Sequence, residues 1–409
     1  MQKESDVVII GGGAAGLVCA IEAKRQDRFK TVAIIEKNDR VGKKLLATGN
    51  GRCNLTNTRI NGDVRQYYTG SFAGQTASLL RRLNADWLRR YFAALGLLTR
   101  SDSEGRCYPL SNHASSVLDV LRFGCERYGV EFICGEQPHS VKKAGELFRI
   151  KTAHNEIAAR KLVIACGSKA SPKLGGSAGG LDMARNFGHR IIPFSPALCP
   201  VPVSSGLLRS LKGIRAAAAV TLTAQDNRFL PKTESGEIQF TENALSGICV
   251  FNLSLFAKPG DILAVDLLND YPEQQVFEII AENKKRFSKL TADNLLTGIL
   301  QKRLAQAVMK QAGVSDFSVP CGSLLPGQIE AIVRTVKHMS FSAEKITAFE
   351  QAQCASGGVA GSEINEKTME SKKVKNLYLC GEVIDSCGIC GGFNLHFAFA
   401  SGYLAGGSL

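Results

Sequence analysis

The sequence contains no run of about 18 apolar residues, which is the length that a membrane-spanning helix needs. Residues 7–21 are apolar, but three consecutive glycines interrupt them. The residues in front of them, which include Glu4 and Asp6, lack the positive charge that begins a signal peptide. We therefore expect a cytoplasmic protein with no membrane partner.

Blocks of five or six like charges are also absent, although 50 Lys and Arg stand against 37 Asp and Glu. The formal net charge of +13 favours anionic partners, among them a phosphate-bearing cofactor. Because the basic residues occur only in short pairs and triplets, we interpret them as a solvated basic surface and do not expect a nucleic-acid partner.

Regular cysteine spacing is a third absence. The 13 cysteines are odd in number and irregularly placed, which argues against a disulfide framework. Only Cys387 and Cys390 have the spacing of a ligand pair, and no second pair follows to complete a zinc site. We predict no metal and interpret most of the thiols as small buried hydrophobic groups.

The composition that remains is globular. The 409 residues are 44% hydrophobic and 21% charged, which suits two or three domains. A β-branched run at 7–10 predicts a strand, helical spacing at 17–25 predicts a helix, and 31–35 predicts a second strand. Together they predict a βαβ unit at the start of the chain.

The pattern changes near residue 193, where four prolines fall within ten residues. Before this point the spacing predicts helices at 78–99, 115–128 and 181–187, and strands at 130–134, 148–152 and 161–166. After it, short strand-like segments at 217–223 and 262–267 precede a strongly helical stretch at 273–312.

These patterns predict an α/β fold with two domains. Residues 1–192 and 341–409 form one discontinuous domain. Residues 193–340 are inserted into it, β-rich at about 193–270 and 316–340, with a helical part at 271–315.

The first motif, Gly11-x-Gly13-x-x-Gly16, follows the first strand and opens the first helix. Gly11 permits a tight turn, Gly13 lets a pyrophosphate approach the backbone, and Gly16 lets the helix pack closely on the strand. The helix amino terminus offers N–H groups and a partial positive charge to the phosphates. Glu36 ends the second strand and can accept both hydroxyl groups of an adenosine ribose. The arrangement predicts dinucleotide binding.

A second motif spans residues 41–57, directly after the ribose-binding carboxylate. It combines glycines, three cations and short polar residues, so it can wrap closely around a polyanion. Arg52 can bridge phosphate oxygens with its forked guanidinium.

A third motif lies about 370 residues after the first. A strand-like run at 376–380 ends at Gly381 and Glu382, and residues 388–395 open a helix that runs through Ser401. The helix amino terminus can stabilise negative charge on the pyrimidine edge of a reduced flavin. Two such motifs indicate FAD and are not needed by a plain NAD dehydrogenase.

These motifs make the chain similar to the HI0933-like flavoproteins, also called BaiN-type or aminoacetone-oxidase-like FAD-binding enzymes. The resemblance covers nearly the whole chain and rests on residues 11–16, 47–57, 236–246, 369–372 and 381–402. It implies a glutathione-reductase-like Rossmann FAD domain that is interrupted by a β-barrel-like domain and a helical subdomain.

The resemblance also implies which residues hold the FAD. The expected contacts are Gly11, Gly13, Ala14, Ala15, Gly16, Glu36, Lys37, Gly42, Lys43, Thr48, Gly51, Arg52, Cys53, Asn54, Pro138, Gly167, Gly381, Glu382, Gly392, Phe393, Asn394 and Leu395.

The chain departs from the family pattern within this implied pocket. Pro138 stands where members often have Val, so the backbone keeps its C=O toward the adenine and loses an N–H. Cys166-Gly167-Ser168 replaces Thr-Gly-Gly, Ser171-Pro172 replaces Tyr-Pro, and His396-Phe397 replaces Gln-Trp. Family members resemble either amine-type oxidases or reductases of steroid-like enones, and these departures prevent the transfer of a substrate.

Two residues near the last helix are candidates for catalysis. His396 lies on its first turn and could move a proton to or from substrate or flavin, or else bond to backbone. Cys390 could form a flavin-linked dithiol with Cys387, because a helix amino terminus lowers a thiol pKa, or else both could serve packing. Cys53 we interpret as a wall of the flavin pocket.

We predict an FAD-dependent oxidoreductase that transfers a hydride between flavin N5 and a small or medium organic molecule, by amine-type oxidation or enone-type reduction. The alternatives are a flavin-dependent RNA-modifying or RNA-binding protein, and a non-catalytic flavin-binding regulatory protein. NAD(P)H stays open as the electron donor, because the nearest second glycine motif, at 175–180, does not directly follow a strand. The sequence does not indicate an oligomeric state.

Overall fold

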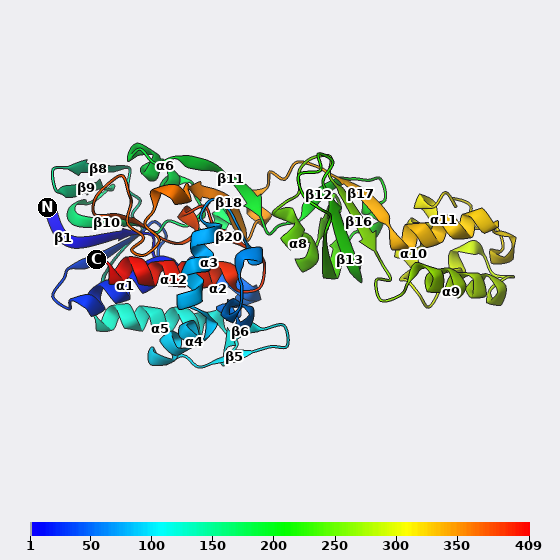
Figure 1. Ribbon diagram of the computed structural model, residues 1–409, viewed down its shortest axis with the longest axis horizontal. Helices are drawn as coiled ribbons and strands as arrows, with labels where there is room; N and C mark the ends of the chain where they lie inside the picture. The colour runs from blue at the N-terminus through cyan, green and yellow to red at the C-terminus, as the bar shows by residue number, and fades with distance from the viewer. Residues whose placement is uncertain (1) are drawn as a thin grey trace. The chain divides into compact units, whose positions relative to one another are not determined.

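The computed structural model describes residues 2–409, which divide into two compact units (Figure 1). Unit 1 runs to Ala197 and resumes from Ala348 to Leu409, and unit 2 is Leu198–Thr347. These divisions fall a few residues after the predicted ones. The reason is strand pairing: β11 (Ile191–Ala197) pairs within unit 1, and β17 (Met339–Ala343) pairs within unit 2.

Unit 1 is built on a seven-stranded sheet of order β7-β2-β1-β10-β9-β8, with β19 also paired to β10. The first four of these strands and β19 run parallel, and β9 and β8 are antiparallel. The strands are β1 (Gln2–Ile10), β2 (Val32–Glu36), β7 (Glu131–Cys134), β8 (Ser140–Ala144), β9 (Leu147–Lys151), β10 (Glu156–Ile164) and β19 (Leu377–Leu379). The carboxyl ends of the parallel strands share one edge, where such sheets bind their ligands.

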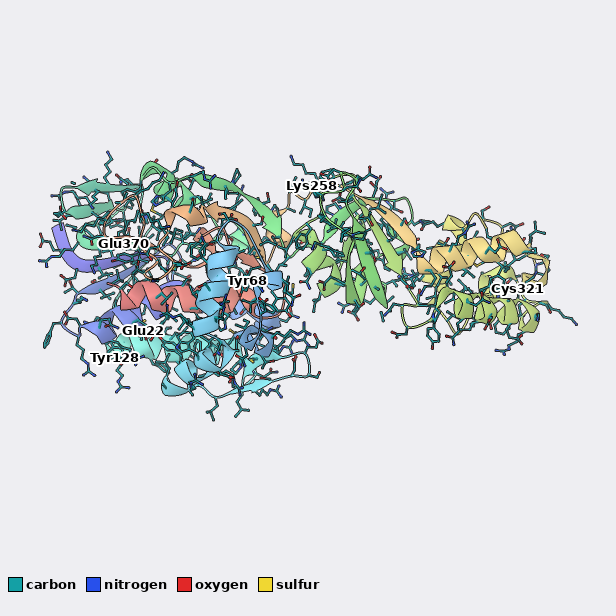
Figure 2. The ribbon with its side chains drawn as sticks, in the orientation of Figure 1. Glu22, Tyr68, Tyr128, Lys258, Cys321 and Glu370 are labelled. Carbon is teal, nitrogen blue, oxygen red and sulfur yellow. The ribbon has the colours of Figure 1, made fainter. Side chains whose placement is uncertain are left out.

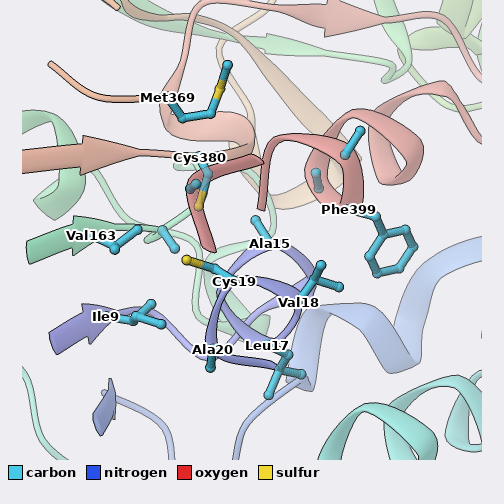
Figure 3. Close-up of a cluster of buried hydrophobic side chains, with 14 of the residues drawn as sticks. Ile9, Ala15, Leu17, Val18, Cys19, Ala20, Val163, Met369, Cys380 and Phe399 are labelled. Carbon is cyan, nitrogen blue, oxygen red and sulfur yellow. The ribbon is translucent and has the colours of Figure 1, made fainter. Parts of the chain in front are cut away.

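Helix α1 (Ala14–Gln26) is buried along nearly its whole length, because elements cover it on more than one side. It contacts α5 (Ala114–Arg127) and α12 (Phe393–Gly407) as well as the sheet. Figure 3 shows Cys19 of α1 between Ile9 and Val163 of the sheet and Phe399 of α12. The hydrophobic core of unit 1 lies in these layers.

Helices α1 and α12 approach so closely that no side chain fits between them at two points. A Cβ atom at Gly402 would lie 2.3 Å from the carbonyl oxygen of Ala15, and one at Gly406 would lie 2.4 Å from that of Cys19. Gly402 faces Ala15, and four residues later in both helices Gly406 faces Cys19. The two helices therefore run parallel. At 1.5 Å per residue, α12 begins about 12 Å beyond the start of α1.

The remaining elements of unit 1 cover the sheet edge and its connections. The predicted helix at 78–99 is two helices, α3 (Ala73–Arg82) and α4 (Ala85–Ala94), because Asn84 caps the second one and accepts a hydrogen bond from Trp87 N–H. The others are α2 (Lys43–Ala47), α6 (Gly179–Asn186), β3 (Thr56–Asn57), β4 (Tyr68–Thr69), β5 (Thr99–Ser101), β6 (Arg106–Pro109), β18 (Cys354–Val359) and β20 (Cys387–Gly388).

Unit 2 contains a closed six-stranded antiparallel barrel of order β12-β15-β14-β13-β16-β17, which confirms the predicted barrel-like part. Buried and more exposed residues alternate along β16 and β17, as they do when one face of a strand lines a barrel core. Besides β17, the strands are β12 (Val201–Ser204), β13 (Arg215–Thr223), β14 (Lys232–Phe240), β15 (Ala244–Ser246) and β16 (Ile262–Asp266), with α7 (Leu208–Leu211) and α8 (Ile248–Ser254) beside them.

The helical part of unit 2 consists of α9 (Glu273–Arg286), α10 (Lys302–Gln311) and α11 (Pro326–Lys337). The prediction that 316–340 is β-rich is wrong, because α11 occupies most of that segment. Pro326 stands at the start of α11, where its missing N–H costs nothing. Ile329, Ile332, Val333 and Val336 then bury one helical stripe.

Within residues 2–409, none of the helices has both the length and the apolar character needed to cross a membrane. Over the same residues, no three His, Cys, Asp or Glu side chains group as metal ligands would.

The glycine contact between α1 and α12 yields a stability prediction. We expect Gly402→Ala to lower the free energy of unfolding by about 1–3 kcal/mol, because the new methyl group overlaps the backbone of α1. Gly74→Ala is the matched control: Gly74 is an exposed glycine of α3 with nothing within 4 Å of its Cβ position. This control should be neutral or stabilising by about 0.5 kcal/mol. Urea unfolding measures both, and equal effects would contradict the packing argument.

Candidate functional site

The carboxyl end of β1 and the start of α1 form an open amino terminus. Gly13 is the N-cap residue of α1, and no side chain caps the helix. A Cβ atom at Gly13 would have nothing within 4 Å, whereas one at Gly16 would lie 2.0 Å from the carbonyl oxygen of Gly11. The first glycine therefore leaves room above the helix end, and the second lets the helix lie against the turn. Gly11 itself has φ +111°, which only glycine adopts readily.

The Glu36 carboxylate lies beside this turn and is held by backbone donors. Its Oε2 accepts from Gly12 N–H at 2.9 Å, and its Oε1 accepts from Asn38 N–H at 2.9 Å and from Asn38 Nδ2 at 2.7 Å. Oε1 thus uses both of its lone pairs, whereas Oε2 keeps one for a further donor such as a ribose hydroxyl. The sequence analysis identified Glu36 but missed Asn38. The position of Asn38 two residues after Glu36 was the signal that its amide could bond to the carboxylate.

The loop at 41–57 is tied to the glycine turn and to the end of the chain. Gly42, with φ +75°, donates its N–H to Gly12 O at 2.8 Å. Lys44 Nζ lies 2.7 Å from Glu382 Oε2, across 338 residues of sequence. Lys43, the predicted cofactor contact, lies 3.6 Å from Asp39 in an exposed ion pair. Sequence reasoning missed Lys44.

Arg52, Cys53 and Thr48 lie where α2 runs into the loop. The Arg52 guanidinium carbon lies 4.8 Å from the centroid of the Tyr108 ring, and its Nε donates to the Gly49 carbonyl. The residue as a whole is exposed. Cys53 is fully buried, and burial raises its thiol pKa to about 12, so it is a packed thiol at neutral pH. Thr48 Oγ1 donates to the Leu45 carbonyl at 2.7 Å, and Gly51 has open space around its Cβ position.

The start of α12 is a second open helix terminus. Gly392 is its N-cap residue, with φ +101° and no side-chain cap. The Asn394 side chain accepts from Gly388 N–H at 2.8 Å and donates to Gly388 O at 2.7 Å, which fixes the first turn to β20. The Phe393 carbonyl accepts from the hydroxyl of Tyr68, labelled in Figure 2. Leu395 is half-buried.

Residues from distant segments also meet near the start of α1. Gly381, with φ +75°, would bring a Cβ atom to 3.0 Å from that of Ala15, and its N–H donates to Ser401 Oγ at 3.0 Å. Ser168, next to Gly167, donates to Glu382 Oε2 at 3.4 Å. Ala14 and Lys37 are half-buried in the same region, and Pro138 is half-buried beyond β7.

These features fit an FAD molecule. Two uncapped helix termini point the same way about 12 Å apart along their axes, which suits a pyrophosphate at one and the flavin ring at the other. The buried Asn54 Oδ1 has no hydrogen-bond partner among the described residues, so it could accept from a ring N–H. The Gly13 space and the Glu36 carboxylate suit the phosphates and the ribose.

His396 lies on the first turn of α12, as the sequence suggested, but its side chain is enclosed. Its ring is fully buried, with Nε2 2.6 Å from the Leu83 carbonyl oxygen and Nδ1 2.6 Å from Thr56 Oγ1. A carbonyl only accepts, so Nε2 carries the proton and Nδ1 accepts from the threonine. Burial lowers the His396 pKa to about 4. The structure thus favours the alternative, a neutral histidine that fixes α12, and we assign it no proton transfer.

Cys387 is buried in β20, and the thiol of Cys354 from β18 lies 3.2 Å from its own. Cys390 is half-buried two residues before the α12 N-cap. The spacing within Cys387-x-x-Cys390 therefore did not reveal the close partner that the fold gives Cys387.

The neutral His396 makes stability depend on pH. Its folded pKa lies below the unfolded value, so the unfolded state binds the proton first and stability is lost as pH falls from about 6.5 to 4. We expect the titration of His396 to lower the free energy of unfolding by about 3 kcal/mol over that pH range. His396→Gln should flatten the profile by that amount, while other histidines contribute equally to both proteins. Parallel urea-unfolding profiles would show that His396 is not buried neutral.

The Lys44–Glu382 pair predicts an energetic coupling between distant segments. In a double-mutant cycle with Lys44→Met and Glu382→Gln, we expect a coupling energy of about 1 kcal/mol in urea unfolding. Lys43→Met, which removes the exposed pair with Asp39, should change stability by less than about 0.5 kcal/mol. Additive single-variant effects would argue against the pair.

Comparison with known proteins places this geometry in context. The HI0933-like protein Rossmann domain model matches residues 5–408. A 3-dehydro-bile acid delta(4,6)-reductase of Clostridium scindens is 35% identical over 404 residues, which are 97% of each chain. A ribosomal RNA dihydrouridine synthase of Haemophilus influenzae is 27% identical over 409 residues, which are 98% of each chain.

The fold is also found among solved structures. The open conformation of a flavocytochrome c3 fumarate reductase matches with a TM-score of 0.51 and 15% identity, over 99% of this chain and 78% of that one. This match supports the Rossmann-type architecture alone. The family match spans nearly all of the sequence and confirms the resemblance drawn from the motifs, so the chain belongs to the family of HI0933-like proteins with a Rossmann domain.

Proposed function

We propose that the protein is an FAD-dependent oxidoreductase that reduces a carbon–carbon double bond conjugated to a carbonyl in a medium-sized organic molecule. The observation that carries the proposal is the parallel pair α1 and α12, whose uncapped amino termini lie about 12 Å apart along the helix axes. Family membership and the 35% identity to a bile acid reductase support the direction of the reaction and the enone type of substrate.

When bound, FAD supplies the hydride chemistry, and the chain supplies binding, orientation and charge. The α1 amino terminus would hold the pyrophosphate, and Glu36 Oε2 would accept a hydrogen bond from the ribose. Lys44 holds Glu382 in place between the two halves of the site. These contacts would hold the nucleotide, and the start of α12 would hold the flavin ring.

The α12 amino terminus acts on the charge that reduction creates. Its first-turn N–H groups and helix dipole would stabilise negative charge at the pyrimidine edge of a bound flavin. Asn394 keeps this turn in place through its two bonds to Gly388, and buried His396 holds the same helix to Thr56 and Leu83. These residues position the donor dipoles before substrate arrives.

A second candidate is reduction of a uridine in RNA, since the uracil C5=C6 bond is also conjugated to a carbonyl. The observation that favours it is charge: residues 40–100 contain 11 Lys and Arg and two Asp and Glu, although the chain has no long basic run. Arg81, Arg82 and Arg90 of this segment are exposed. The two 27%-identical relatives named ribosomal RNA dihydrouridine synthases agree with it, but the higher identity favours the small-molecule enone.

An anaerobic stopped-flow experiment separates these proposals. We expect NADH or NADPH to bleach the flavin absorption band at about 450 nm. A steroid-type enone should then restore the band without oxygen. Restoration by uridine-containing RNA instead, with affinity falling steeply with salt, would favour the second candidate. A band that neither nicotinamide bleaches would remove NAD(P)H as the donor. No flavin band after FAD addition would overturn the flavoenzyme proposal.

A further inference from the structure

Two thiols that are distant in sequence meet beside the candidate flavin site. Cys354 of β18 and Cys387 of β20 place their sulfur atoms 3.2 Å apart. Each residue is only 2% exposed. The S–S bond of a disulfide is about 2.05 Å long, so the two sulfur atoms would need to move about 1 Å closer to bond. The strands already hold both side chains in facing positions.

The pair adjoins both halves of the site. Gly388, which follows Cys387, exchanges two hydrogen bonds with Asn394 on the first turn of α12. Strand β18, which carries Cys354, also contacts the turn at Gly381–Val383 that contains Glu382. Cys387 is therefore one residue from Gly388, which holds the first turn of α12 in place. This is the turn proposed above to hold the flavin ring.

Burial decides which reagents can reach the pair. It raises the pKa of the Cys354 thiol, so that group stays protonated. Both residues are shielded from bulk thiolates and disulfides. Cys321 of unit 2, labelled in Figure 2, is also fully buried, but its thiol donates to the Thr291 carbonyl at 3.3 Å.

We propose that Cys354 and Cys387 form a dithiol–disulfide pair that exchanges two electrons with the bound flavin. The proposal rests on the flavin binding proposed above. In the oxidising direction the two S–H bonds break and one S–S bond forms, while two electrons and two protons pass to oxidised flavin and give reduced flavin. The reverse step regenerates the dithiol. The pair thus adds a second two-electron store next to the ring.

Peptide mapping tests whether the disulfide forms. One sample of the holoenzyme is fully reduced and another is fully reoxidised. A flavin-free sample is oxidised with hydrogen peroxide, which is reduced to water. All samples are then denatured and alkylated. We expect a Cys354–Cys387 cross-linked peptide, lighter by two hydrogen atoms, only in the oxidised samples. Cys354→Ser should abolish it, and the control Cys321→Ser should keep it. A link at Cys19–Cys380, whose thiols also lie in contact, or no link at all, would overturn the proposal.

An electron count tests the exchange with flavin. Anaerobic dithionite titration of the oxidised holoenzyme should consume twice as many electrons per flavin as the Cys387→Ser variant, with Cys321→Ser matching wild type. A cross-link without the extra electrons would overturn the exchange while leaving flavin binding intact. If no flavin binds, the function proposed above fails, and mapping of the flavin-free chain still reports on the sulfur pair.

Discussion

The close parallel contact between α1 and α12 is the constraint on which the rest of the site depends. Gly402 and Gly406 bring α12 onto the backbone of α1 at Ala15 and Cys19, closer than any side chain would permit. A helix is rigid along its axis, so this contact fixes both amino termini at once. The nucleotide end and the flavin end of the site are therefore spaced by helix packing, and the loops only complete them.

Electrostatics follows from this geometry. Neither helix has an acidic residue in its first turn or a side-chain cap, so both termini keep their partial positive charge for a ligand. The nearby carboxylates are already ordered: Glu36 by backbone N–H groups and Glu382 by Lys44. Ordered acceptors beside unneutralised donors suit a molecule that combines phosphates with sugar hydroxyls.

Burial decides what each reactive residue type does. His396 lies on the first turn of the helix, where an exposed histidine could move protons, yet enclosure between Thr56 and Leu83 leaves it neutral and structural. Cys387 has the spacing of a dithiol with Cys390, yet the fold brings Cys354 against it. The same enclosure turns Cys53 into a packed thiol. The residue type indicates which chemistry is possible. The burial of the side chain and its neighbouring groups determine whether its pKa allows that chemistry.

The family resemblance implied the inserted barrel, and the sequence by itself determined the βαβ unit, the Gly11–Gly16 turn, Glu36 and the presence of an inserted β-rich domain. These depend on periodicity and on backbone conformations that neighbouring residues set within a few turns. Only the tertiary structure decided that Lys44 rather than Lys43 meets Glu382, that His396 is enclosed and that Cys354 faces Cys387. It also revealed helix α11 where strands were predicted, because its apolar stripe packs against the other elements of unit 2. Contacts that cross 33 to 340 residues leave no periodic signal, since they arise from how finished elements pack.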